Sequence, residues 1–560
     1  MKTAPQPGAR AMTPINRRRV VTDFALAALL GSAAGFTMTA RKAQAAKVGL
    51  RPSEPLVRDV TSPISIELKF ANGKSLQFSE DKAVALAPYV DPRGAFTQLC
   101  RMASVAGSPF TVFFRPDEKS SRVEVVVELG WLGRDPANVG AYVATISRSG
   151  NQLARVNVPE HYWWARWRWQ SERRPVRKTS EELQKAALVP KFDAGVVAGQ
   201  KRITNPDEYR PMSFPGLSSG MADTGERPEI GLLTDVQAEW LCTESAAALE
   251  QLIVQAEAHA SVPVHVRDET MGPISIQRYP TASSFWDPAA GNADPSVAPA
   301  PRTFIEPNKG HYPSLAFVPF LLTGDPYYLE EVQFTAQAAL LDYNTDYRKR
   351  DKGVLGDEEP RGWAWSVRSM FQAVLATGDN VPSWLAPRAY FERVLDHNLN
   401  WFVENHLKDR NPLKSACHFA VSSPFDEVGP WQQDFLTATL GWAVAAGFAK
   451  WRPVYEWQAR QAIGRARGEG GYPKSQAIQY FLKTDGATDW RSLARVNGLT
   501  ETPDGGFPES ADANYAAYLR GALVIAEQLK LEGAREALDY VDGQVELHGW
   551  LPYKWAFARR

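Results

Sequence analysis

Five short segments of the chain combine carboxylates, aromatic rings, amides, histidine and arginine. They are Met221–Gly231, Asn308–Pro313, Gly356–Trp365, Trp431–Asp434 and Asp504–Tyr515. Aromatic faces stack on sugar rings, and guanidinium, amide and carboxylate groups form paired hydrogen bonds with hydroxyl groups. This mixture, repeated in five places, is typical of a cleft that binds a glycan.

The acids in these segments could hydrolyse a glycosidic bond. Hydrolysis needs one carboxylic acid that protonates the bridging oxygen and one carboxylate that activates water or attacks carbon. Asp223 and Glu229 are candidate bases, and Asp434 is a candidate acid. Because Glu226 lies between the first two, at least one of these three acids should have a raised pKa if they are buried together. Glycosidic-bond hydrolysis by paired carboxylates is our leading hypothesis.

The alternative is a polysaccharide lyase, which removes a proton beside a uronate carboxyl group. Such an enzyme needs a base, and a group that neutralises the carboxylate. Candidate bases are His311, Tyr312 and Tyr515, and candidate neutralising groups are Arg227, Arg361 and Gln432. An unsaturated product distinguishes this reaction from hydrolysis.

The polar and aromatic side chains around these groups are candidates for substrate binding. The set is Glu226, Arg227, Tyr312, Arg361, Trp363, Trp365, Trp431, Gln432 and Tyr515. A non-catalytic glycan-binding protein of the cell envelope would keep the aromatic residues and tolerate loss of the acids. Glycan binding without catalysis is therefore a third hypothesis, and in all three the partner is a poly- or oligosaccharide.

Other chemistries have little support in the sequence. It contains no His-Glu-x-x-His motif, no Cys/His set with metal spacing and no phosphate-binding Gly-x-x-x-x-Gly-Lys-Ser/Thr loop, so we predict neither a metal nor a cofactor. The string Gly216–Gly220 matches the Gly-x-Ser-x-Gly pattern of serine hydrolases but lacks a strand–turn–helix context. Cys100, Cys242 and Cys417 lie far apart and are expected to be buried thiols.

Residues 1–45 are predicted to be a signal peptide. Three arginines, Arg17 to Arg19, precede the apolar run Phe24–Met38, and Ala43–Ala45 has the small-x-small pattern of a cleavage site. The segment resembles a bacterial twin-arginine signal. That resemblance implies the twin-arginine export machinery as a partner and a periplasmic or secreted protein. We expect no stable membrane insertion after cleavage, because the run is shorter than the ~20 residues that a span needs.

Charge is unevenly distributed along the chain. The whole sequence has 63 basic and 63 acidic residues, but residues 1–46 hold seven basic residues and one acid. The rest of the chain therefore carries a net charge of −6. A mildly acidic chain is a poor match for a polyanion, so we predict no nucleic-acid partner.

The elements that must position these groups fall into two regions. Alternating or β-branched runs at 64–70, 110–114, 123–129, 142–146, 153–158 and 166–169 predict strands, and we assign residues 46–175 to a β-sandwich domain. Trp163, Trp164, Trp167 and Trp169 end this region. We favour packing between the two domains over a sugar-stacking platform for them, because alternation places Trp167 and Trp169 on one face.

Residues 176–560 have a helical texture with a repeat. Five helix–turn–helix hairpins are predicted, at 236–259, 314–341, 363–406, 435–467 and 515–545, and 179–188 or 475–483 could add helices for a sixth. Gly324 and Gly378 lie where a left-handed helix end is needed. Turns within hairpins are short and connections between them are long, so we expect the site where long connections enter each first helix.

This layout resembles the (α/α) toroid of carbohydrate-active enzymes, in which a β-sandwich recurrently precedes the ring of helices. The fold class predicted is therefore α+β, with an N-terminal β-sandwich followed by an (α/α) toroid. In endoglucanase-type toroid hydrolases the base lies in the first helical entry and the acid near the C-terminal end. The resemblance implies Asp223 and Glu509 in these two roles.

Overall fold

The computed structural model describes residues 62–130, 137–219, 227–284, 308–356, 359–421, 426–508, 513–545 and 551–560. The predicted signal peptide and the acids Asp223, Glu226 and Glu509 lie outside these ranges. Val60–Arg560 form one compact unit. Within the described ranges, every helix is too short or too polar to cross a membrane.

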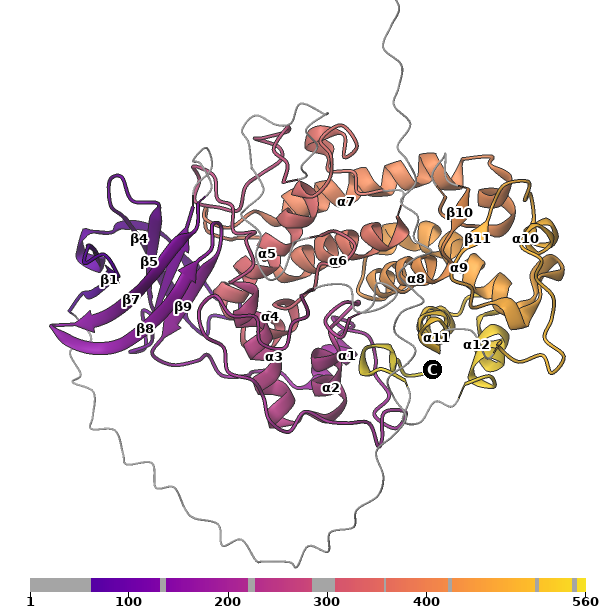
Figure 1. Ribbon diagram of the computed structural model, residues 1–560, viewed down its shortest axis with the longest axis horizontal. Coiled ribbons are helices and arrows are strands. Elements are labelled where there is room, and N and C mark those ends of the chain that lie inside the picture. Colours follow the sequence, from indigo (N-terminus) through magenta and orange to yellow (C-terminus); the bar gives the residue numbers. More distant parts are fainter. Residues whose placement is uncertain are drawn as a thin grey trace, which may run out of the picture. The chain divides into compact units, whose positions relative to one another are not determined.

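Residues 64–170 form two antiparallel sheets, with strand orders β2-β1-β7-β8 and β3-β4-β5-β6-β9 (Figure 1). The strands are β1 (Ile64–Phe70), β2 (Ser75–Ser79), β3 (Val84–Val90), β4 (Thr97–Ser104), β5 (Phe110–Pro116), β6 (Val123–Leu129), β7 (Val139–Arg148), β8 (Asn151–His161) and β9 (Arg166–Gln170). The six predicted runs are strands, and β2, β3 and β4 are additional. Every residue of β6 is buried, so both faces of the second sheet are covered at its centre.

One face of the second sheet packs against the first sheet. The ring of Phe110 lies 5.6 Å from that of Tyr142, and the indole N–H of Trp167 donates to the Tyr142 hydroxyl at 2.8 Å. Trp167 and Trp169 pair with Val127 and Val125, which places both indoles on this face, as the alternation predicted. Trp163, Trp164 and Trp167 are at most 3% exposed, so they pack inside the protein, but Trp167 packs between the two sheets and not between the sheets and the helices.

The helices follow the sheets along the chain (Figure 1). They are α1 (Ser180–Lys185), α2 (Asp235–Thr243), α3 (Ala246–His259), α4 (Phe317–Thr323), α5 (Pro326–Leu341), α6 (Pro360–Ala376), α7 (Arg388–Phe402), α8 (Pro430–Ala445), α9 (Arg452–Arg467), α10 (Trp490–Val496), α11 (Ala513–Gln528) and α12 (Ala534–Asp542). A two-residue strand pair, β10 (Glu427–Val428) and β11 (Leu482–Lys483), lies among them. The five predicted hairpins are α2/α3, α4/α5, α6/α7, α8/α9 and α11/α12. The α+β layout is therefore confirmed.

A left-handed glycine was predicted at the end of α4 and at the end of α6, and the structure has it only after α4. Gly324 ends α4 in the left-handed conformation (φ 67°), and the Asp325 carboxylate then accepts from the N–H of Tyr327 at the start of α5. The prediction for Gly378 was wrong, because α6 ends on the extended Thr377 and α7 begins only at Arg388. Of the two alternatives for a sixth hairpin, residues 179–188 contain α1, whereas residues 475–483 hold no α-helix. They hold the end of a short 3-10 turn and strand β11.

The first helices of consecutive hairpins lie side by side. Helix α4 contacts α6, α6 contacts α8, and α8 contacts α11. The 3-10 turn Tyr553–Trp555 contacts both α11 and α2. From α4 to α11, each first helix therefore contacts the next, and the turn Tyr553–Trp555 connects α11 to α2.

The other face of the second sheet meets α3 and α5 through buried charges. Arg166 contacts Glu128 and Glu330 at 3.0 Å and Glu331 at 2.5 Å, and Glu330 also receives Arg115 at 2.6 Å. We name the whole set the ion-pair network: Arg115, Asp117, Arg122, Glu124, Glu128, Arg166, Arg168, Arg174, Glu257, Arg267, Asp325, Glu330 and Glu331. Each member is at most 8% exposed. The network fastens the sheet to the helices, since loss of one partner leaves a buried charge uncompensated.

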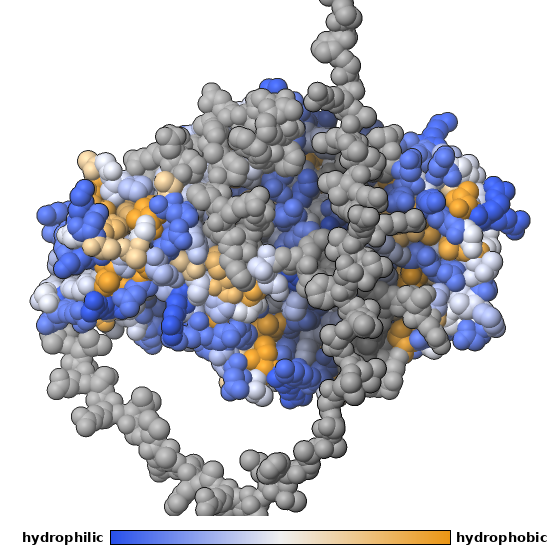
Figure 2. All heavy atoms as spheres, in the orientation of Figure 1, coloured by the Kyte–Doolittle hydropathy of each residue, from blue (hydrophilic) through white to orange (hydrophobic). Residues whose placement is uncertain are grey.

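Hydrophobic side chains on the face shown in Figure 2 lie as separate patches between hydrophilic ones. The large hydrophobic residues that are exposed include Tyr480 and Phe481, which follow the 3-10 turn Lys474–Gln476. These two aromatic residues belong to the long connection between α9 and α11.

Candidate functional site

The five predicted segments converge at the N-terminal ends of α2, α4, α6, α8 and α11. Hydrogen bonds, ion pairs and ring contacts connect each segment to the next. We name this set the helix-entry site: Arg227, Glu229, His311, Glu359, Arg361, Trp431, Gln432, Tyr480 and Tyr515.

Arg227 joins the first segment to the second. Its guanidinium donates to the backbone oxygen of His311 at 2.7 Å and to that of Ser218 at 2.9 Å, and it lies 3.5 Å from Glu229. The Glu229 carboxylate accepts from the N–H of Ser218 at 2.9 Å. Burial lowers the pKa of Arg227, and Glu229 opposes that shift. The Glu229 side chain is 2% exposed, and its contacts with Ser218 and Arg227 fix the position of the Arg227 guanidinium.

The segment that carries His311 is held by its backbone. Gln237 of α2 donates to the carbonyl of Ser314 at 2.9 Å, and Arg368 of α6 donates to that of Tyr312 at 2.8 Å. The capping box of Thr234 and Gln237 at the start of α2 fixes the donor. Two neighbouring first helices therefore set the position of the imidazole.

The hydrogen bonds of His311 determine which of its nitrogens is basic. Its Nδ1 lies 3.1 Å from the side-chain oxygen of Asn308, which also accepts from the N–H of Gly310 at 2.9 Å. Since this oxygen only accepts, Nδ1 carries the proton and Nε2 carries the lone pair. Nε2 has no hydrogen-bond partner among the described residues.

Two guanidinium groups act on this imidazole. Burial, then Arg361 and then Arg227 lower the pKa of His311 to about 4. The ring is therefore neutral at pH 7, with Nε2 able to accept a proton. A neutral base near two cations is suited to a substrate that is itself an anion.

Arg361 joins the second segment to the third and fourth. Gly310 lies close to Arg361, since a Cβ atom added at Gly310 would lie 3.2 Å from the Nε of Arg361. The guanidinium carbon of Arg361 lies 5.4 Å from the centre of the Trp431 ring. Arg361 pairs with Glu359, the residue before α6, which also accepts from Gln432 at 3.3 Å. The Nε of Arg361 has no hydrogen-bond partner within the described ranges.

Three aromatic rings form a stack beside Arg361. Trp431 lies 6.1 Å from Tyr480 with the planes 4° apart, and 6.0 Å from Tyr515 with the planes 21° apart. Trp431 is 3% exposed, whereas Tyr480 is 49% exposed. The sequence interpretation missed Tyr480 and its neighbour Phe481. An aromatic pair within a long polar connection was the available signal.

Four predicted site residues lie elsewhere. Asp434 is buried between α8 and α9 and pairs with Arg465 at 2.5 Å, so its carboxylate does not join the helix-entry site. Burial raises the pKa of Asp434, and Arg465 and Gln461 oppose the shift. The Tyr312 hydroxyl lies 3.1 Å from Nε2 of His259 inside the protein.

The two tryptophans of α6 belong to the core. Trp363 stacks on Phe402 at 4.8 Å, and Trp365 packs on Phe435 at 4.8 Å. Each is 1% exposed, so neither offers a free face for a sugar ring. The segment before α6 therefore contributes Glu359 and Arg361, and its tryptophans hold the helix in place.

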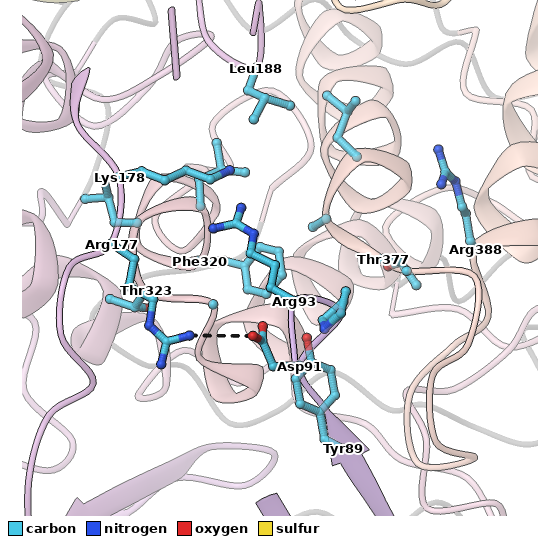
Figure 3. A pocket seen from close by; sticks show the side chains of 17 residues that line it. Tyr89, Asp91, Arg93, Arg177, Lys178, Leu188, Phe320, Thr323, Thr377 and Arg388 are labelled. Atoms are coloured by element: carbon cyan, nitrogen blue, oxygen red, sulfur yellow. Dashed lines mark ion pairs between the residues drawn. The ribbon is translucent and has the colours of Figure 1, made fainter. Parts of the chain in front are cut away.

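A cavity lies at the short-turn side, away from the helix-entry site (Figure 3). Its volume is about 260 Å³, and the loop after β3, the segment Arg177–Lys178 and the ends of α4 and α6 line it. Asp91 pairs with Arg177 at 3.6 Å, and the Arg177 N–H donates to the carbonyl of Leu322 near the end of α4 at 2.8 Å. The basic side chains that line this cavity lie near the C-terminal ends of α4 and α6, where the helix dipoles are negative. Stabilisation of these helix ends explains the basic side chains without a ligand.

Comparisons of the chain with protein-family models, with curated proteins and with solved structures found no match. The function proposed below rests on the geometry of the helix-entry site.

Proposed function

We propose that the helix-entry site cleaves uronate-containing glycans by β-elimination, with His311 as the base. In this reaction Nε2 of His311 takes the proton from the carbon beside the carboxylate, a carbon–carbon double bond forms and the glycosidic carbon–oxygen bond breaks. The departing oxygen then takes up a proton. One observation carries the proposal, namely a neutral imidazole that lies near the charges of Arg227 and Arg361 and whose Nε2 has no partner among the described residues.

The two arginines supply the electrostatic part of the mechanism. A uronate carboxylate makes the neighbouring C–H more acidic only when its charge is neutralised, and guanidinium groups bind carboxylates with two parallel hydrogen bonds. Arg227 and Arg361 are both at most 7% exposed, so their charges are weakly screened by water. The stack of Trp431, Tyr480 and Tyr515 supplies ring faces for neighbouring sugars.

Hydrolysis by paired carboxylates has less support. Of the predicted acids in the described ranges, Glu229 is engaged by Ser218 and Arg227, and Asp434 is paired with Arg465. The other three lie outside those ranges. Hydrolysis and glycan binding without catalysis are therefore kept as outcomes of the experiment.

We also propose that the two sheets form a β-sandwich and that the five hairpins close into an (α/α) toroid. Contacts from α4 through α6 and α8 to α11, and from Tyr553–Trp555 back to α2, support a closed ring of first helices. The proposed twin-arginine signal in residues 1–45 would place the activity in the periplasm or outside the cell.

The product decides between the candidate functions. The protein is incubated with uronate-rich polysaccharides, and ultraviolet absorbance of an unsaturated sugar is followed together with new reducing ends. We expect both signals to rise in equal amounts. New reducing ends without absorbance would establish hydrolysis, and binding without either signal would leave a glycan-binding protein.

A further inference from the structure

Three side chains meet at a buried point beside the ion-pair network. They are His259 at the end of α3, His265 in the segment after it, and Glu331 of α5. The ligand atoms, one per residue, lie within 4.8 Å of one another. Nε2 of His265 is 2.9 Å from Oε2 of Glu331, and Nδ1 of His259 contacts the same oxygen.

The outer nitrogens of both histidines have hydrogen-bond partners. Nδ1 of His265 is 2.9 Å from the backbone oxygen of Trp164, which only accepts, so Nδ1 carries the proton and Nε2 the lone pair. Nε2 of His259 lies 3.1 Å from the hydroxyl of Tyr312 and 3.2 Å from that of Thr335.

A repulsion between electron pairs remains at His265 and Glu331. Neutral His265 directs the lone pair of Nε2 at a carboxylate oxygen that also carries lone pairs, 2.9 Å away. Arg166 donates to the other oxygen of Glu331, at 2.6 Å from its Nε and 2.5 Å from its Nη2. A cation at the point where the ligand atoms of His259, His265 and Glu331 meet resolves this repulsion. Histidines that bind metals characteristically donate their other N–H to a carboxylate, a backbone carbonyl or water, as His265 does to Trp164.

The charge of the surroundings admits a cation. The ion-pair network contains six guanidinium groups and seven carboxylates, which leaves a net charge of −1 when the histidines are neutral. The guanidinium groups are those of Arg115, Arg122, Arg166, Arg168, Arg174 and Arg267. The carboxylates are those of Asp117, Glu124, Glu128, Glu257, Asp325, Glu330 and Glu331.

We propose that His259, His265 and Glu331 bind a divalent transition-metal ion, with Zn²⁺ the best match, in a structural role. Two imidazole nitrogens and one carboxylate suit zinc, whereas Ca²⁺ and Mg²⁺ prefer oxygen ligands throughout. His259 and Glu331 are 0% exposed and His265 is 3% exposed, so the ion has no open path to a substrate. It joins α3 to α5 and, through the Trp164 carbonyl, to the end of the second sheet.

Metal analysis of the full chain tests the proposal. The protein is purified without chelators, loaded with Zn²⁺, desalted and analysed by plasma mass spectrometry. We expect about one zinc ion per chain, loss of zinc in His265→Gln, and retention in the control His311→Ala. A zinc content below about a tenth of an ion per chain in the unaltered protein would overturn the proposal, because the cation would then be a bound proton.

Two measurements on the unaltered protein keep the test valid if His265→Gln does not fold. Replacing zinc with Co²⁺ should give the visible absorption of a four-coordinate site. Chelator treatment should lower Tm by several degrees, and added zinc should restore it. Absence of the cobalt spectrum, or a Tm that chelation leaves unchanged, contradicts a structural metal.

Discussion

Histidine and arginine occur together in two regions of this protein, and the two regions use them differently. Beside the ion-pair network, His259 and His265 have both ring nitrogens in contact with partners, and Arg166 meets three carboxylates. In the helix-entry site, His311 has one nitrogen without a partner among the described residues, and within the same ranges Glu359 is the one carboxylate that pairs with Arg361. Side chains whose polar atoms all contact other groups hold the fold. Side chains with a polar atom that has no partner are available for chemistry.

The largest effect on stability is expected from Arg166→Met. The substitution leaves Glu128, Glu330 and Glu331 facing one another without their shared cation. Breaking a buried ion pair costs about 3–5 kcal/mol, and we expect at least this loss in the free energy of unfolding. Urea denaturation measures it. Arg361→Met serves as the matched control in the other region, and an equal loss there would remove the distinction between the two regions.

A smaller loss of stability is expected from Asp434→Asn. The amide keeps the shape and the contact with Gln461 but leaves Arg465 without its counter-ion, at a cost of about 1–3 kcal/mol. Glycan cleavage by the folded variant should stay within about twofold of the unaltered protein. A thousandfold loss of activity without unfolding would restore Asp434 as a catalytic acid.

Arg361→Gln should move the acid limb of the pH–rate profile. The pKa of His311 is lowered to about 4, so the base is active above that pH and the rate falls as pH drops through it. Removing one cation makes the imidazolium less unfavourable, and the limb should shift upward toward the ordinary histidine pKa of about 6.5. The measurement is kcat/KM against pH. A limb that stays in place would show that Arg361 does not act on His311.

The smallest effect is expected at the exposed end of the aromatic stack. Tyr480→Ala removes one ring face from the site and touches neither His311 nor its arginines. An aromatic contact of this kind is worth about 0.5–1.5 kcal/mol, so KM should rise roughly 2- to 10-fold with kcat nearly unchanged. Tyr347→Ala, at another tyrosine that is 49% exposed, is the control. Equal changes in both variants would argue against a sugar subsite at Tyr480.

Much of the fold could be predicted from the sequence because its signals are local. Alternation in Ile64–Phe70 and the turn at Gly324–Asp325 each act within a few residues. The segments that enter the first helices were recognisable for the same reason, and Arg227, His311 and Arg361 do come together there. The ion-pair network was not recognisable, since Glu330 and Glu331 face arginines more than 160 residues away.

The errors within the predicted site have one physical origin. A segment that enters a helix shows several polar and aromatic residues, but helix rotation decides which of them face the entry. Arg361 faces it, whereas Trp363, two positions later, packs on Phe402 of α7. Asp434 similarly turns toward α9. The sequence identifies the segment, and the packing of neighbouring helices selects the residue.

The most direct test of the account is the rate of β-elimination by His311→Ala. Removal of a general base should lower kcat/KM on a uronate polysaccharide by about 10²- to 10⁴-fold, with the free energy of unfolding changed by less than about 1 kcal/mol. His397→Ala, at a half-buried histidine of α7 that is not part of the helix-entry site, should behave like the unaltered protein. Unchanged formation of the unsaturated product by folded His311→Ala would contradict the assignment of His311 as the base.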